Sequence, residues 1–238
     1  MISARVAYRI SLAAGLLALV VVFIFRAVPI DACGTVPSSA TVISAELART
    51  QADVDAIFAP APGQPCTKER AHDLYLQTMI DTVAFIPTYG VFMIFFFLAM
   101  VPRDEYGAFA GFTLTVVAVF ADYVENICMF HIFNQPYAAG WALAVIPWAT
   151  GVKWILLGLA GAFGGMILIK SGRVNYPAAV ACFLGLLGPV LAIANPHLFK
   201  SFAAATALSL ITFLVVVARN AFAAPSAIAE LEVEDGAA

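Results

Sequence analysis

The stretch GAFAGFTLTVVAVFADYVENICMFHI, residues 107–132, decides the fold class. An α-helix of roughly 20 mostly apolar residues crosses the hydrocarbon core of a bilayer, which is about 30 Å thick. The stretch shows no two-residue alternation of polar and apolar side chains, as a strand of a membrane barrel would. It therefore predicts a membrane-spanning helix, although it contains the acidic residues Asp122 and Glu125.

Further apolar stretches accompany this one along the chain. They cover about 8–28, 77–101, 143–169, 177–194 and 199–219. Proline and polar residues separate them, as expected where helices end. The sequence thus predicts an all-α, polytopic transmembrane bundle of six spans in a single domain over 1–222, followed by an acidic, disordered tail over 223–238.

Composition supports a membrane protein. Of the 238 residues, 63% are hydrophobic and only 11% are charged, whereas soluble domains carry about 25% charged residues. A soluble enzyme and a disordered chain are therefore excluded. The 12 basic and 15 acidic residues give a net charge of −3, which leaves no basic face for a nucleic acid.

Basic residues outside the apolar stretches predict the orientation. If the N-terminus is cytoplasmic, most of the basic residues near span ends fall on that side: Arg5, Arg9, Arg103, Lys170, Arg173 and Arg219. Cytoplasmic loops carry such an excess of Lys and Arg. We therefore expect an N-in, C-in topology in a bacterial inner membrane, with the first span an uncleaved anchor rather than a signal peptide.

The polar segment 29–76 then lies outside the cytoplasm. Residues 44–58 place apolar side chains near one helical face, which predicts a short amphipathic helix on the membrane surface or over the bundle. Cys33 and Cys66 bracket this helix, and an oxidising compartment favours a disulfide between them. Two unpaired cysteines are the alternative.

Charged residues inside the apolar stretches carry the functional signal. Each of Asp81, Asp122, Glu125 and Lys153 costs about 2.5 kcal/mol or more at mid-bilayer, and such residues usually face a bundle interior. At about 1.5 Å per residue, Asp122 and Lys153 both lie about 15 Å below the outer boundary, on neighbouring antiparallel spans. The sequence therefore predicts an ion pair between Asp122 and Lys153.

Neighbouring residues extend this pair into a candidate site. Asp122, Glu125 and Asn126 have i, i+3, i+4 spacing and share one helix face. One lysine balances one acid, so Glu125 or Asp81 becomes a candidate for handling a proton or an ion. The candidate site residues are Asp81, Tyr89, Asp122, Glu125, Asn126, Lys153 and Trp154, with Tyr89 and Trp154 as walls.

Three functions agree with these patterns. The first is a membrane protein with an outward-facing charged pocket that binds or passes a small solute, cation, proton or lipid headgroup. The second is an accessory subunit that contacts a membrane partner through the last two spans, with the charges only fixing helix register. The third is a lipid hydrolase or transferase, although the chain has no G-x-S-x-G or H-E-x-x-H motif. The sequence leaves any cofactor unknown, and the three histidines lack metal-binding spacing.

Overall fold

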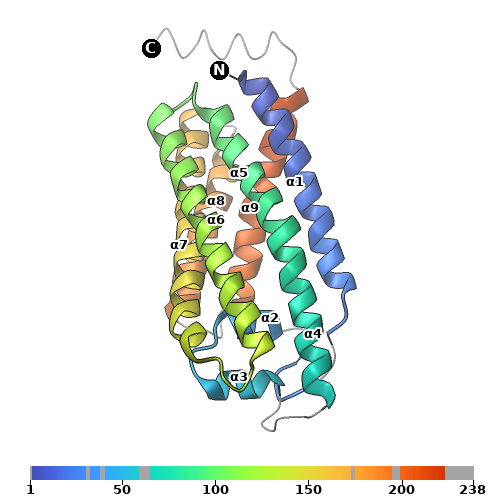
Figure 1. Ribbon diagram of the computed structural model, residues 1–238. Helices are drawn as coiled ribbons and strands as arrows, with labels where there is room; N and C mark the ends of the chain where they lie inside the picture. Colours follow the sequence, from blue (N-terminus) through green and yellow to red (C-terminus); the bar gives the residue numbers. More distant parts are fainter. Residues whose placement is uncertain are drawn as a thin grey trace. The chain divides into compact units, whose positions relative to one another are not determined.

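The computed structural model describes residues 2–30, 33–37, 41–58, 65–172, 175–194 and 199–222. Within these residues all regular secondary structure is helical (Figure 1). The elements are α1 Ala4–Ala27, α2 Thr41–Glu46, α3 Gln51–Phe58, α4 Pro65–Ile80, the π-helical turn η2 Asp81–Phe85, α5 Ile86–Met100, α6 Glu105–Asn134, α7 Gly140–Lys170, α8 Tyr176–Ala194 and α9 Phe199–Phe222. The predicted all-α class is confirmed. The acidic tail predicted for 223–238 lies outside the described residues.

Several helices are long and apolar enough to cross a membrane. Among the described residues there are four such stretches: Ala4–Phe25, Cys66–Met100, Glu105–Asn134 and Gly140–Lys170. The described parts of α8 and α9 that qualify as apolar are shorter, Tyr176–Leu187 and Leu208–Phe222. Four of the six predicted spans therefore have helices of sufficient length, and the six-span topology stays a prediction.

The second long helical stretch begins earlier than the sequence predicted. Its expected start was residue 77, but α4 begins at Pro65 and continues through η2 into α5. The first turns of α4 are polar, so hydropathy does not mark them. Proline is favoured at the first helical position because its missing N–H would be unpaired there in any case.

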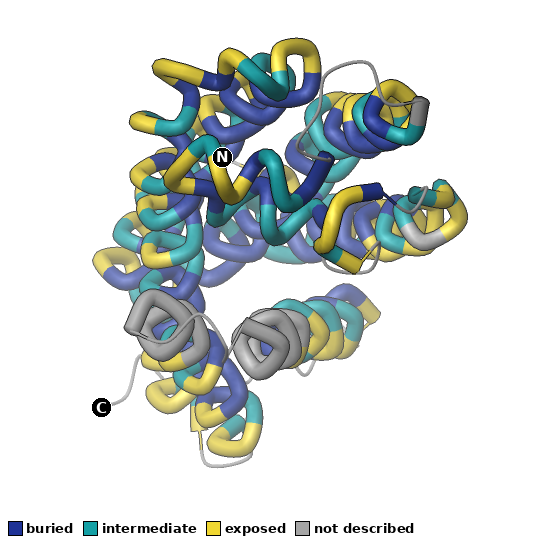
Figure 2. The backbone as a smooth tube through the Cα atoms, turned by 90° about the horizontal axis from the view of Figure 1, so that it is seen from below, coloured by how far each residue is buried: buried dark blue, intermediate teal, exposed yellow. Residues whose placement is uncertain are grey.

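The distribution of polar and apolar side chains on the helices is the reverse of that in a water-soluble bundle. On α6 the exposed side carries apolar side chains, Val117, Phe120, Val124 and Ile127. Figure 2 shows buried and exposed residues on opposite sides of individual helices. Because apolar side chains face outward over several helical turns, contact with the hydrocarbon of a bilayer is the environment that fits them.

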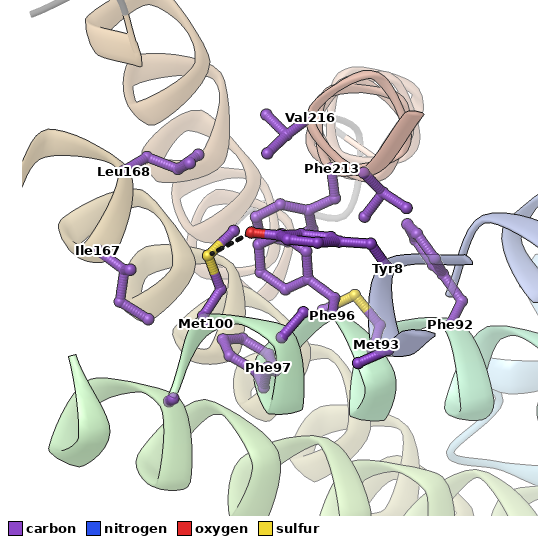
Figure 3. Packing of buried hydrophobic residues seen from close by; sticks show 14 of the residues in the cluster. Tyr8, Phe92, Met93, Phe96, Phe97, Met100, Ile167, Leu168, Phe213 and Val216 are labelled. Carbon is purple, nitrogen blue, oxygen red and sulfur yellow. Dashed lines mark hydrogen bonds between the residues drawn. The ribbon is translucent and has the colours of Figure 1, made fainter. Parts of the chain in front are cut away.

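The chain forms two compact units. The first comprises Met1–Leu17, Tyr89–Val116 and Ile155–Ala238, and the second comprises Ala18–Thr88 and Val117–Trp154. The core of the first unit is aromatic: Phe96 stacks on Phe213 with ring centroids 4.3 Å apart, and both rings are fully buried. Figure 3 shows these rings beside Tyr8, whose hydroxyl group donates a hydrogen bond to the sulfur of Met100 at 3.6 Å.

Glycines allow close packing within the first unit. A Cβ atom added at Gly158 would lie 3.0 Å from the Cα of Leu186 on α8, and one at Gly165 would lie 3.1 Å from the carbonyl oxygen of Ala179. The small residues of α7 thus bring its backbone against α8, as small residues do in membrane helix pairs. Helices α8 and α9 also pack against each other.

The second unit contains the segment that connects α1 to α4. Cys33 and Cys66 form a disulfide, as predicted. The buried guanidinium of Arg70 donates to the carbonyl oxygens of Cys33, Val36 and Ile57, at 3.1 Å for Val36 and 2.7 Å for Ile57. Arg70 therefore holds this segment together by hydrogen bonds.

The predicted amphipathic helix over 44–58 is wrong in one respect, because the structure contains two helices, α2 and α3. Thr50 is the N-cap of α3. Its hydroxyl oxygen accepts from the Asp53 N–H at 3.3 Å, while the Asp53 carboxylate accepts from the Thr50 N–H at 2.8 Å. This reciprocal pairing is a capping box, which starts a new helix. The apolar side of α3, Val54, Ile57 and Phe58, is fully buried.

Candidate functional site

Three helical elements of the second unit position the charged side chains. Asp122, Glu125 and Asn126 lie on α6, Lys153 lies on α7, and Asp81 begins η2. Asp122, Glu125, Asn126 and Lys153 are each no more than 4% exposed. The i, i+3, i+4 spacing on α6 thus turns its polar residues inward, away from the exposed apolar side.

Lys153 is the centre of the site. Its ammonium Nζ lies 3.1 Å from Oδ1 of Asp122 and 2.5 Å from Oε1 of Glu125. The ion pair predicted between Asp122 and Lys153 is confirmed, and Glu125 shares the same ammonium. The ammonium also lies 4.6 Å from the ring centroid of Trp154, close enough for a cation–π interaction.

A hydrogen bond from Asn126 connects Asp81 to the other charged side chains of the site. The Asn126 amide nitrogen Nδ2 donates to Oδ2 of Asp81 at 2.6 Å and to the hydroxyl oxygen of Thr82 at 2.9 Å. One amide therefore connects α6 to the π-helical turn. Asp81 and Lys153 also interact electrostatically.

The π-helical turn has a local cause in the sequence. The N–H of Ile86 bonds to the carbonyl oxygen of Asp81, five residues earlier. The next residue, Pro87, has no N–H to donate, and its ring clashes with the carbonyl four residues before it in a regular α-helix. A π-helical turn relieves that conflict, and such turns are frequent at functional sites.

Glu46, the last residue of α2, is a fourth carboxyl group at this site, and the sequence did not single it out. It interacts electrostatically with Lys153, Asp122 and Asp81, and the Trp154 side chain also acts on its carboxyl group. The hydroxyl group of Thr150 on α7 donates to the Glu46 carbonyl oxygen at 3.1 Å. We call Glu46, Asp81, Asp122 and Glu125, together with Lys153, the acidic cluster.

Burial governs the protonation of Glu46, which lies outside the candidate spans. Loss of contact with water raises the pKa of its carboxyl group above the ordinary value of 4.5. Lys153 lowers this pKa, while the neighbouring acids Asp122 and Asp81 raise it, and the balance is upward. The protonated form of Glu46 is thus favoured relative to a carboxyl group in water.

The structure does not test the role of one predicted site residue, Tyr89. Tyr89 on α5 is buried and belongs to the first unit, whereas the acidic cluster belongs to the second. Its role as a wall stays a prediction. Trp154, the other predicted wall, does contact Lys153.

The arrangement defines a class of protein: an all-α bundle with helices long enough to span a membrane and with buried ion pairs. Comparison of the chain with protein-family models, curated proteins and solved structures found no match. Function must therefore be inferred from the acidic cluster itself.

Proposed function

We propose that this protein is an integral membrane protein whose acidic cluster binds and releases protons on the extracytoplasmic side of a bacterial inner membrane. Six spans form one membrane domain over 1–222, with both termini in the cytoplasm. The segment that carries α2 and α3 then lies outside, where an oxidising environment supports the Cys33–Cys66 disulfide.

A single observation carries the proposal: within the part of the chain that the structure describes, the acidic cluster has more acids than cations. Lys153 is the cation that acts on Glu46, Asp81 and Glu125. If Asp122 is counted as the partner of Lys153, the carboxyl groups of Glu46, Asp81 and Glu125 still share the same single ammonium. Each uncompensated ion buried away from water costs several kcal/mol, so bound protons or another cation must neutralise the remaining acids. The number of protons held then depends on pH.

The geometry favours protons over a coordinated metal ion. Among the described residues no three His, Cys, Asp or Glu side chains are arranged to hold a metal. One oxygen of Glu125 is already bound to Lys153, and the other, Oε2, is buried with no hydrogen-bond partner among the described residues. A protonated carboxyl group needs no counter-ion, so protonation removes the electrostatic cost without further ligands.

Infrared difference spectroscopy of the protein in lipid nanodiscs tests the proposal. Lowering the pH across the neutral range should produce the carbonyl-stretch band of a buried, protonated carboxyl group. Glu125→Gln and Asp81→Asn should reduce or shift this band. Glu105→Gln is the matched control, because Glu105 is an exposed acid on the same helix as Glu125, and it should leave the band unchanged.

Two results would contradict the proposal. If no carboxyl band titrates, the acidic cluster is a fixed network that only sets helix register. If sodium or potassium at constant pH removes the band, a small cation competes with the proton, and the acidic cluster is a cation site instead.

A further inference from the structure

Glu46 differs from the other acids of the acidic cluster in where it comes from. Asp81, Asp122 and Glu125 lie within the long apolar helical stretches, whereas Glu46 ends α2, outside all of them. The acidic cluster is therefore completed by a side chain from the segment between α1 and α4. Neighbouring residues of this segment, Ala45 and Ala48, are also buried.

The two helices of this segment are held by different contacts. Next to α3, the disulfide and the hydrogen bonds of Arg70 join the chain around Cys33, Val36 and Ile57. Gln51 at the start of α3 donates to the carbonyl oxygen of Pro136 at 2.6 Å. Gly34 adopts a φ of 63°, and a Cβ atom there would lie 2.4 Å from the Ala56 carbonyl oxygen. The α3 side is therefore anchored by bonds that do not change with protonation of the acidic cluster.

Helix α2, by contrast, contacts the acidic cluster through Glu46. The carbonyl oxygen of Glu46 accepts a hydrogen bond from Thr150 on α7. Its carboxyl group interacts electrostatically with charged residues of three elements: Lys153 on α7, Asp122 and Glu125 on α6, and Asp81 in η2. The turn 47–50 separates α2 from the anchored α3. A change of charge on Glu46 thus acts on the docking of α2 while α3 remains held.

We propose that α2 is a gate over the acidic cluster, and that ionisation of Glu46 opens it. Protonated Glu46 stays docked and covers the cluster. When Glu46 loses its proton, its carboxylate is an ion held away from water, a cost that the attraction of Lys153 does not offset. Helix α2 then undocks, and the proton is exchanged with extracytoplasmic water. This inference rests on the proposed proton function and assigns its regulation to one residue.

The direction of the pH dependence follows from linkage. Docking raises the pKa of Glu46 above 4.5, so docked α2 is most stable below pH 4.5, where Glu46 is protonated in both states. As pH rises from 4.5 toward the raised pKa, the undocking equilibrium constant increases by about tenfold per pH unit. Above the raised pKa it levels off, because Glu46 is then ionised in both states.

Hydrogen exchange of the α2 amides in nanodiscs measures this equilibrium. After correction for intrinsic exchange rates, protection of α2 should fall as pH rises, by about tenfold per unit within the window. Glu46→Gln keeps the size of the side chain but cannot ionise. Protection of the α2 amides in this variant should therefore be high and independent of pH. Asp55→Asn is the matched control, since Asp55 lies on α3 and bonds to Gln51 through an oxygen that asparagine retains. The α2 protection of this variant should show the same dependence on pH as that of the wild type.

The outcomes separate the gate from the proton function. Flat α2 protection in the wild type, or an unchanged slope in Glu46→Gln, overturns the gate. If the infrared band still titrates in that case, the proton function stands without a gate. If α2 protection changes as expected but the infrared band is lost only in Glu46→Gln and is unaffected by Glu125→Gln and Asp81→Asn, the gate remains. The proposed proton function of the acid residues within the spans then fails.

Discussion

Replacing Lys153 by methionine is the most direct perturbation of the acidic cluster. Methionine has a similar length and fits an apolar surrounding, so the change removes the ammonium with little change in packing. The wild-type ammonium bonds to two carboxylates, at 3.1 Å and 2.5 Å, and its side chain is 5% exposed. Asp122 and Glu125 thus lose a shared cation at a buried site.

The expected loss in the free energy of unfolding is large for a single substitution. Removing one partner of a buried ion pair costs about 3–5 kcal/mol, because the remaining charge is buried without compensation. Lys170→Met is the matched control on the same helix. Lys170 also pairs with an acid, Asp104, but its side chain is 63% exposed, so we expect a loss of about 1 kcal/mol or less.

The assay is reversible unfolding in mixed detergent micelles at several pH values. Lower pH should reduce the loss in Lys153→Met, by up to about 1.4 kcal/mol per pH unit for each carboxyl group that binds a proton on folding. Adding Asp122→Asn and Glu125→Gln to Lys153→Met should recover part of the stability, because no unpaired carboxylate then remains beside the methionine. Equal losses at positions 153 and 170, or a triple variant with the summed loss of the single variants, would refute the reasoning.

Two further stability predictions test the packing of each unit. Replacing Cys33 and Cys66 together by serine should lower stability by roughly 3–4 kcal/mol, since the disulfide closes a long loop. Unfolding with and without reductant measures this, and reductant should have no effect on the variant. Gly164→Ala should cost about 1–3 kcal/mol in thermal unfolding, because the new Cβ would lie 2.6 Å from the ring of Phe213. Gly151→Ala, where no atom lies within 4 Å of the added Cβ, should be neutral or stabilising by up to about 1 kcal/mol.

The ion pair could be predicted from sequence because membrane spans restrict position strongly. An apolar stretch of known length fixes the depth of each residue to within about one helical turn. Asp122 and Lys153 were therefore placed at one level without any tertiary information. Because a charge exposed to lipid is costly, the helix faces that carry these residues could also be predicted to be buried in the bundle.

Glu46 could not be predicted by the same reasoning. It lies in a polar segment, where neither hydropathy nor depth restricts the position of a side chain, and an acid on a short amphipathic helix usually faces water. Its burial depends on tertiary contacts of the segment, such as those of Arg70 and Gln51. The division into α2 and α3 was present in the sequence, however, because Thr50 and Asp53 have capping-box spacing.

The structure also bears on the choice between a functional acidic cluster and one that only fixes helix register. A network that serves packing alone is most stable when each ion has a partner, because every unpaired buried charge lowers stability. Here Lys153 already bonds to Asp122 and Glu125, yet Asp81 and Glu46 act on the same ammonium. A neutral residue at position 46 would accept the Thr150 hydrogen bond equally well, since Thr150 donates to the backbone carbonyl oxygen of Glu46. The carboxyl group of Glu46 is thus unnecessary for that contact, and proton exchange gives a physical reason for its presence.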